Sequence, residues 1–331
     1  LYRGDKDYSA ALREFSMAVA ALPNDPSLFA YMAAVHRRQG RWSEALAVSQ
    51  RAVDLDPRNG DGVIRAANGL AFVRDWSGAR AAFNRARGVV PDSAYPQIGL
   101  AYLEVFQNQD PAAASNILQS IAAGADPDGE VTSARWDLAM LERNYPAAEK
   151  LLADFRGETF PKEDATPTAF YHGRTALARG DIAAAERYFI AATPALEAHV
   201  RNDPDDLDWR ARLALLYAYR QRKEDAVREA RDAVAKEPES DNAYYGAFRV
   251  ANLALVYALV GEQDEAITLI ERLLSTPGPV QWPDYPMSMT LADLRLRWEW
   301  DSLRSNPRFQ KILAGPEPKT ALASSAEAGS E

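Results

Sequence analysis

The sequence predicts an all-α protein, a right-handed superhelical α-solenoid of about eight helix pairs with a C-terminal capping segment. An interval of 34 residues separates four alanines, Ala11, Ala45, Ala79 and Ala113. Prolines and aromatic residues keep the same interval, at Pro23, Pro57, Pro91, Tyr8, Trp42 and Trp76. These residues are much rarer than alanine, so their shared register indicates an internal repeat. Repeats of this length stack into solenoids, in which each unit buries its apolar face against its neighbours.

Each position of the repeat has a physical role in a pair of antiparallel helices. A small residue such as Ala45 lies where the second helix crosses the first, because a large side chain would force the backbones apart. Bulky residues such as Phe15 and Phe83 fill the space between successive pairs. A glycine such as Gly40 ends the first helix, and a proline after the second helix prevents its continuation.

The repeat continues in a looser form towards the C-terminus. Further alanine anchors are Ala148, Ala185, Ala226 and Ala266, at intervals of 35, 37, 41 and 40 residues from the preceding anchor. Long loops at 124–130 and 156–168 are candidate hinges, although simple drift in loop length would explain them too. We therefore divide the chain into regular repeats (1–123, the first truncated), an irregular repeat with a possible hinge (124–168), longer repeats (169–275), a capping segment (276–314) and a disordered tail (315–331).

A helix-pair repeat of 34 residues resembles the tetratricopeptide repeat (TPR) family, over roughly residues 1–275. The resemblance implies that the first helix of each pair lines a concave surface. Tyr2 already occupies the end of a first helix, so we expect the natural protein to continue upstream of Leu1.

The segment "LRLRWEWDSLRSNPRFQKIL" (294–313) is not a standard repeat. It resembles the closing segment of bacterial multidomain signalling proteins, in which a TPR array follows a cyclase, a serine/threonine kinase or a winged-helix domain with a TolB-like region. The matching residues are Trp300, Asp301, Leu303, Arg304, Asn306, Pro307, Arg308, Phe309 and Leu313. Ser302 and Asn306 depart mildly from that pattern. We expect the aromatic residues here to cap the last repeat, and a binding patch is the alternative.

Composition and motifs argue against catalysis. The chain of 331 residues has no cysteine and only three histidines, His36, His172 and His199, which lie in different repeats. It contains no phosphate-binding glycine loop, nucleophile elbow or metal-binding histidine spacing, so we predict no catalytic residue, metal or cofactor. The net charge of -9 disfavours nucleic acid as a partner, and no apolar run is long enough to cross a membrane. We expect a cytoplasmic location, or a periplasmic one if a signal peptide lies upstream.

Positions on the first helices give the candidate partner-binding residues. Counting from the alanine anchors, these are Arg37, Arg38, Arg65, Asn68, Phe72, Arg174, Arg212, Leu215, Tyr219, Asn252 and Leu259. Arginine grips a carboxylate bidentately, so this surface suits an extended peptide or a helix of acidic character. Alternatively, these arginines only keep an exposed face soluble. The TPR subclass that clamps a C-terminal carboxylate uses paired Lys and Asn, whereas Ser27, Tyr31, Asp61 and Arg65 stand at the corresponding positions here.

The sequence therefore predicts a non-catalytic scaffold that binds a protein or peptide, as the regulatory or sensory arm of a larger bacterial signalling protein. One alternative is the non-catalytic part of an enzyme whose cyclase or kinase domain lies upstream. Others are an exported or lipid-anchored assembly factor and an RNA-binding helical repeat.

Overall fold

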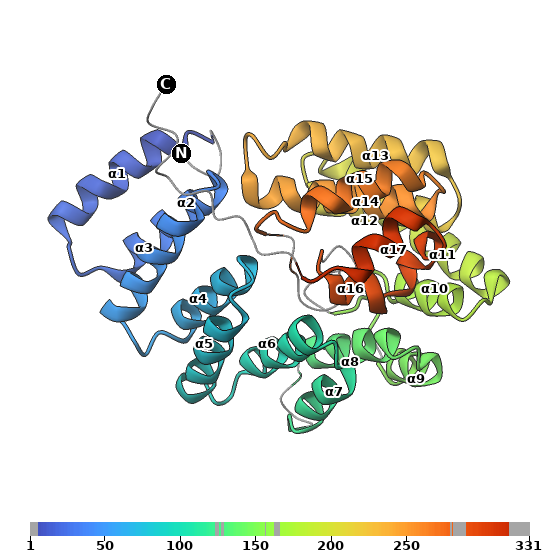
Figure 1. Ribbon diagram of the computed structural model, residues 1–331, viewed down its shortest axis with the longest axis horizontal. Helices are drawn as coiled ribbons and strands as arrows, with labels where there is room; N and C mark the ends of the chain where they lie inside the picture. The colour runs from blue at the N-terminus through green and yellow to red at the C-terminus, as the bar shows by residue number, and fades with distance from the viewer. Residues whose placement is uncertain are drawn as a thin grey trace.

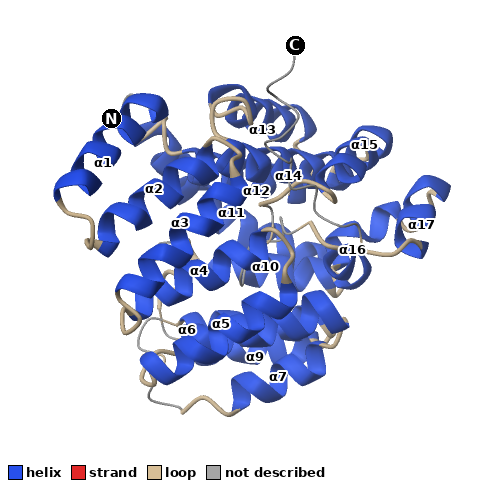
Figure 2. Ribbon diagram, turned by 60° about the vertical axis from the view of Figure 1, so that its left-hand side comes forward, coloured by secondary structure: helices blue, strands red, loops and turns tan. Residues whose placement is uncertain are grey.

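The computed structural model describes residues 6–122, 126, 129–155, 157–161, 166–278, 280 and 289–317. Within these ranges the chain is a stack of antiparallel helix pairs (Figure 1). In the described residues the only extended pairing is an isolated bridge between Thr159 and Pro167, and Figure 2 draws only helices and loops there. The predicted all-α solenoid is confirmed.

The first helices of seven pairs are α2 (Pro26–Arg38), α4 (Gly60–Phe72), α6 (Tyr95–Leu103), α8 (Glu130–Leu141), α10 (Thr168–Ala178), α12 (Leu207–Tyr219) and α14 (Ala243–Leu259). Their partners are α3 (Trp42–Leu55), α5 (Trp76–Val89), α7 (Pro111–Gln119), α9 (Tyr145–Asp154), α11 (Ile182–Asn202), α13 (Lys223–Lys236) and α15 (Gln263–Leu273). Helix α1 (Tyr8–Ala21) precedes them and packs on α2. The chain ends in α16 (Leu291–Leu296), the 3-10 helix η3 (Trp298–Leu303) and α17 (Pro307–Ala314).

One turn geometry recurs before every second helix. A residue with positive φ comes directly before the N-cap, at positions 6, 40, 74, 109, 143, 180, 221 and 261. The N-caps follow at 7, 41, 75, 110, 144, 181, 222 and 262. Four residues after each N-cap lies a buried alanine, at most 7% exposed: Ala11, Ala45, Ala79, Ala114, Ala148, Ala185, Ala226 and Ala266. The turn therefore fixes which side chain enters the helix crossing.

The fourth alanine corrects the sequence register. The sequence predicted Ala113 as the anchor, but Ala113 is only partly buried and Ala114 is 0% exposed. The cause is a π-helix, η1 (Glu104–Asn108), which extends α6 by a wider turn. The amide of Asp110 donates to the carbonyl of Glu104, six residues back, whereas the equivalent amide of Asp75 donates to Leu70, five residues back. One extra residue thus enters the repeat and shifts its anchor by one.

The superhelix curves until its first and last pairs meet. Helix α2 contacts α14, and the indole of Trp42 lies edge-on to the ring of Tyr244 with centroids 6.3 Å apart. The guanidinium of Arg37 lies 4.5 Å from the centre of the same ring. The first helices therefore enclose an inner groove.

The C-terminal residues 289–317, which we call the closing segment, begin with α16 in the middle of this curve and end with α17 against the last pair (Figure 1, red). Helix η3 packs on α14, α17 packs on α15, and α16 packs on η1 at the end of α6. The segment thus covers the last repeat and also reaches inner surfaces well before it. The predicted division into regions stays a prediction, and residues 318–331 of the predicted tail lie outside the described residues.

A substitution at Gly180 tests the role of the left-handed residue in the recurrent turn. Its φ is +87°, and a Cβ added there meets nothing within 4 Å, so Gly180→Ala changes only the backbone strain. We expect a loss of about 1–2 kcal/mol in the free energy of unfolding, measured by urea denaturation followed by circular dichroism. Gly88→Ala in α5 is the matched control. It also meets no atom but lies in a helix, so it should gain up to about 1 kcal/mol. A gain at both positions would contradict the role of the left-handed turn.

Candidate functional site

The structure separates the predicted partner-binding residues into two groups. On α10, α12 and α14, five of the predicted residues are buried, with exposures of 1–7%: Arg174, Arg212, Leu215, Tyr219 and Asn252. The sixth, Leu259, is partly exposed. On α2 and α4, Arg65 is exposed, Arg37, Arg38 and Asn68 are partly buried, and Phe72 is buried. Arg174 and Tyr219 contact the closing segment, through Glu299 and Trp298, whereas Asn252 donates to the carbonyl of Ala211 on the neighbouring α12. That any of them binds a partner stays a prediction.

The centre of the covered groove is a buried ion pair. Arg174 of α10 donates to Glu299 of η3 over 2.8 Å, and both side chains are 1% exposed. The same guanidinium lies 4.9 Å from the ring centre of Trp136. Burial alone would lower the pKa of Arg174, but Tyr219 and Glu299 outweigh it and raise that pKa. The ring of Tyr219 stacks on Trp298, with centroids 5.8 Å apart. The carboxylate of Glu299 is thus held by Arg174, and the preceding Trp298 is held by Tyr219.

A second buried cluster joins α8 to the closing segment. Arg297 donates to both carboxylate oxygens of Asp137, over 2.7 and 3.0 Å, and to Asp293 over 2.8 Å. The hydroxyl of Tyr102 donates to Asp137 over 2.7 Å. Burial would raise the pKa of Asp137, but Arg297 outweighs it and lowers that pKa. For Asp293 burial prevails and raises the pKa. Asp137 is therefore the carboxylate that stabilises the buried guanidinium.

Arg74, the left-handed residue between α4 and α5, fastens the segment to the first half of the solenoid. Its guanidinium donates to the carbonyls of Met289 at 2.9 Å, Thr276 at 3.3 Å and Leu273 at 3.4 Å. Its Nε lies 3.7 Å from Glu317. Burial lowers the pKa of Arg74 to about 10. One buried side chain thus contacts α15 and both ends of the closing segment.

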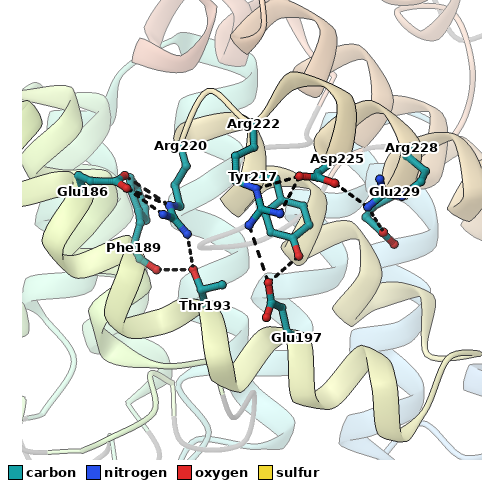
Figure 3. Close-up of polar contacts among 10 residues, drawn as sticks. All are labelled: Glu186, Phe189, Thr193, Glu197, Tyr217, Arg220, Arg222, Asp225, Arg228 and Glu229. Carbon is teal, nitrogen blue, oxygen red and sulfur yellow. Dashed lines mark hydrogen bonds and ion pairs between the residues drawn. The ribbon is translucent and has the colours of Figure 1, made fainter.

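A further concentration of charge lies among α11, α12 and α13 (Figure 3). Arg220 pairs with Glu186 at 2.8 Å and donates to Thr193, and Tyr217 donates to Glu197 at 2.8 Å. Burial, followed by Glu197, raises the pKa of Tyr217 to about 12. On the neighbouring turn of α13, Arg222, Arg228, Asp225 and Glu229 are also paired. These charges satisfy one another and join adjacent repeats, so we do not assign a ligand to them.

The accessible candidates meet in one opening, which we call the N-terminal cleft. It lies between α2, α3 and α4, with Tyr245 of α14 at its edge, and has a volume of about 370 Å³. Three arginines line it, Arg37, Arg38 and Arg65, and none of the described lining residues is Asp or Glu. Tyr31, 47% exposed, provides aromatic surface, and Trp42, 7% exposed, also lines the opening.

Two arginines of the cleft, Arg37 and Arg65, have weak polar contacts. Arg37 Nε has no hydrogen-bond partner, and burial lowers the pKa of Arg37 despite the nearby Tyr244 ring, with Arg38 and Arg65 adding to the decrease. Arg65 lies 3.5 Å from Asp61, but these side chains are 69% and 82% exposed, so the pair contributes little. The cleft is therefore a concentration of positive charge in a chain of net charge -9.

Two of the three histidines, His172 and His199, have structural contacts, and His36 Nδ1 is buried with no hydrogen-bond partner. His172 Nδ1 lies 2.9 Å from Glu149, and its ring stacks on Tyr188. His199 stacks on Trp209 with centroids 3.8 Å apart. Among the described residues no group of three or more His, Asp or Glu is placed to hold a metal ion. Over the same residues, no helix is both long and apolar enough to cross a membrane.

Sequence reasoning did not single out Arg74, Asp137, Arg297 or Glu299. Two signals were available. Asp137 interrupts the apolar run of α8, and Glu299 lies between two tryptophans. Both would be costly to bury without a partner, so each indicates a buried ion pair. Neither signal identifies the partner residue.

These features define the class of the protein, an α-solenoid of TPR-like helix pairs. Yeast Tom70 shares this fold, with a TM-score of 0.50 and 17% sequence identity over 93% of this chain and 62% of that one. A tetratricopeptide repeat protein from Parabacteroides merdae gives a TM-score of 0.45 and 14% identity, over 76% of this chain and 93% of that one.

Sequence comparison is less extensive. A human protein, the SGT1 homolog, is 24% identical over 127 residues, which are 38% of this chain and 34% of that protein. The chain thus matches about a third of the length of this curated relative. No protein-family model matches the chain.

The Asp137 cluster gives a prediction for stability. Asp137→Asn leaves the buried Arg297 with only Asp293, and removing one partner of a buried pair is strongly destabilising, so we expect a loss of about 3 kcal/mol. Asp293→Asn should cost less than half as much, because Asp293 accepts one hydrogen bond from Arg297 and Asp137 accepts two. Urea denaturation at neutral pH measures both. Equal losses would mean that the two carboxylates are equivalent.

The same cluster predicts a pH dependence. The pKa of Asp137 is lower in the folded state than its value of about 3.9 in the unfolded chain. The contribution of Asp137 to the free energy of unfolding is therefore complete above the unfolded pKa, and it is lost as the pH falls through the lowered pKa. Asp137→Asn should therefore lose less stability than the wild type between about pH 4 and pH 2. Parallel acid profiles of the two proteins would contradict the lowered pKa.

Proposed function

We propose that this chain is a non-catalytic protein-interaction scaffold that binds an acidic peptide or helix in the N-terminal cleft. The observation that carries the proposal is the set of three arginines around an opening lined by no described carboxylate. Guanidinium groups bind carboxylates with paired, charge-assisted hydrogen bonds. Tyr31 and Trp42 add apolar contact, which gives an acidic segment with aliphatic or aromatic residues an advantage over a purely charged one.

We further propose that the scaffold is the regulatory arm of a larger bacterial signalling protein that works in the cytoplasm. Support comes from the resemblance of residues 294–313 to the closing segment of such proteins. The coding sequence upstream of Leu1 tests this part directly. A cyclase, kinase or winged-helix domain there agrees with it, and a signal peptide there would instead favour an exported factor.

Peptide binding tests the cleft. The probe is a short fluorescein-labelled peptide of Asp and Glu with one Leu and one Phe, and the readout is fluorescence anisotropy. The double variant Arg38→Ala/Arg65→Ala removes two charges from the cleft. We expect its Kd to rise by at least about tenfold, because hydrogen bonds to charged groups contribute roughly 1.5–3 kcal/mol each. Raising the salt concentration should weaken binding to the wild type.

Arg85→Ala is the matched control. Arg85 is an exposed arginine on α5, so its removal loses one charge outside the cleft and should change the Kd less than twofold. A peptide with Gln and Asn in place of Glu and Asp should bind weakly. If Arg85→Ala weakens binding as much as the double variant, the attraction is general electrostatics and the cleft is not the site.

A further inference from the structure

The closing segment lies where a ligand of the inner groove would lie. It contacts successive elements of the solenoid: the α4–α5 turn through Arg74, α8 through Asp137, and α10 through Arg174. It continues to α12, where Trp298 stacks on Tyr219, and to α14, where Ser302 Oγ donates to the carbonyl of Ala258. A bound peptide crossing the first helices in turn would make this series of contacts.

The contacts of the closing segment combine apolar packing with fully buried charge. Its Trp300 and Leu303 are both 0% exposed and belong to one core cluster with the repeats, as apolar packing between successive helix pairs would also give. The segment is held in addition by two ion pairs whose side chains are at most 2% exposed, Arg174–Glu299 and Arg297–Asp137. Buried ion pairs bear a large desolvation cost, so they discriminate between partners more than they stabilise a contact. The two ion pairs therefore make the groove selective for a segment with charges at these positions.

Two hydrogen-bond donors of the closing segment have no acceptor in the groove. The indole Nε1 atoms of Trp298 and Trp300 are both buried and have no hydrogen-bond acceptor. A buried donor without an acceptor weakens the bound state relative to water. A competing segment with the same carboxylate and fewer orphaned donors would have an advantage.

We propose that residues 289–317 act as a tethered ligand of the inner groove, and that their release opens a site for a partner segment of the same chemistry. That chemistry is a glutamate flanked by aromatic side chains, as in Trp298-Glu299-Trp300, with Arg174 holding the carboxylate and Tyr219 the preceding ring. The inference extends the proposed scaffold function to a second site. A tethered ligand has a high effective concentration, so binding in trans is suppressed until the segment opens.

Hydrogen exchange followed by mass spectrometry on the full chain tests this inference. Exchange from a tethered ligand occurs by local opening, while α13 and α15 remain protected. Glu299→Gln removes the charge that Arg174 holds, so exchange in residues 291–303 should rise at least about tenfold. Exchange in α15 should change less than twofold. Glu186→Gln, which removes a carboxylate from the separate pair with Arg220, should leave residues 291–303 unchanged.

Binding in trans is measured on the Glu299→Gln protein. A synthetic peptide of residues 294–304, in excess, should slow exchange in α10 and α12. The same peptide with Gln in place of Glu should not. Protection by neither peptide, or by both equally, would overturn the assigned chemistry.

Two other outcomes would overturn the tethered-ligand inference. The first is that residues 291–303 and α15 exchange at one common rate, and that Glu299→Gln accelerates both equally. That result would mean that the segment is a permanent part of the core. The second is that the Glu299→Gln protein loses its helical circular dichroism signal, which would lead to the same conclusion. The variant Trp298→Ala provides a second test, because it leaves the Arg174–Glu299 ion pair in place. These results do not involve Arg38 or Arg65, so failure here leaves the N-terminal cleft to be judged by its own peptide assay.

Discussion

The architecture depends on one steric constraint, the small residue at each crossing of paired helices. A left-handed residue places the N-cap, and the N-cap places an alanine four residues later against the preceding helix. Gly180 and Gly261 adopt this left-handed conformation at little cost, whereas Arg74 and Gln221 do so against their steric preference. The crossing is therefore strong enough to impose its turn on unsuitable residues. Because the same crossing recurs in every pair, the stack curves in one direction, and α2 contacts α14.

Closure of the curve has electrostatic consequences. It places the guanidinium of Arg37 over Tyr244 and so partly shields it from water without giving its Nε a hydrogen bond. It also encloses the inner groove, where Arg174 and Glu299 reach 1% exposure as a pair. Residues 1–100 carry 13 Lys and Arg against 10 Asp and Glu, and the remainder carries 25 against 37. The open cleft therefore belongs to the basic part of the chain, and the covered groove to the acidic part.

How far the sequence could predict this arrangement depends on the range of each interaction. The anchors Ala11, Ala45 and Ala79 follow from contacts within one repeat, so a period of 34 residues finds them. The sequence did not predict Ala114 as an anchor, because the π-helix at Glu104–Asn108 adds a residue inside a helix and no glycine or proline marks that residue. The burial of Arg174 under the closing segment could not be predicted for a different reason. Periodicity identifies inward-facing positions, but Glu299 lies 125 residues away and belongs to no repeat.

Contacts of Trp42 connect the N-terminal cleft to α14 and to Gly278, which follows α15. Trp42 lines the N-terminal cleft and also contacts Tyr244 of α14. A Cβ on Gly278 would lie 3.8 Å from the indole of Trp42, and the amide of Gly278 donates to the carbonyl of Phe72. Gly278 follows α15 and belongs to the stretch that leads into the closing segment. A shift of α2 and α3 relative to α14 therefore moves one wall of the cleft and, at the same time, one attachment of that stretch. Coupling between two sites requires an element that both of them bias, and the junction of α2, α3 and α14 meets that requirement geometrically.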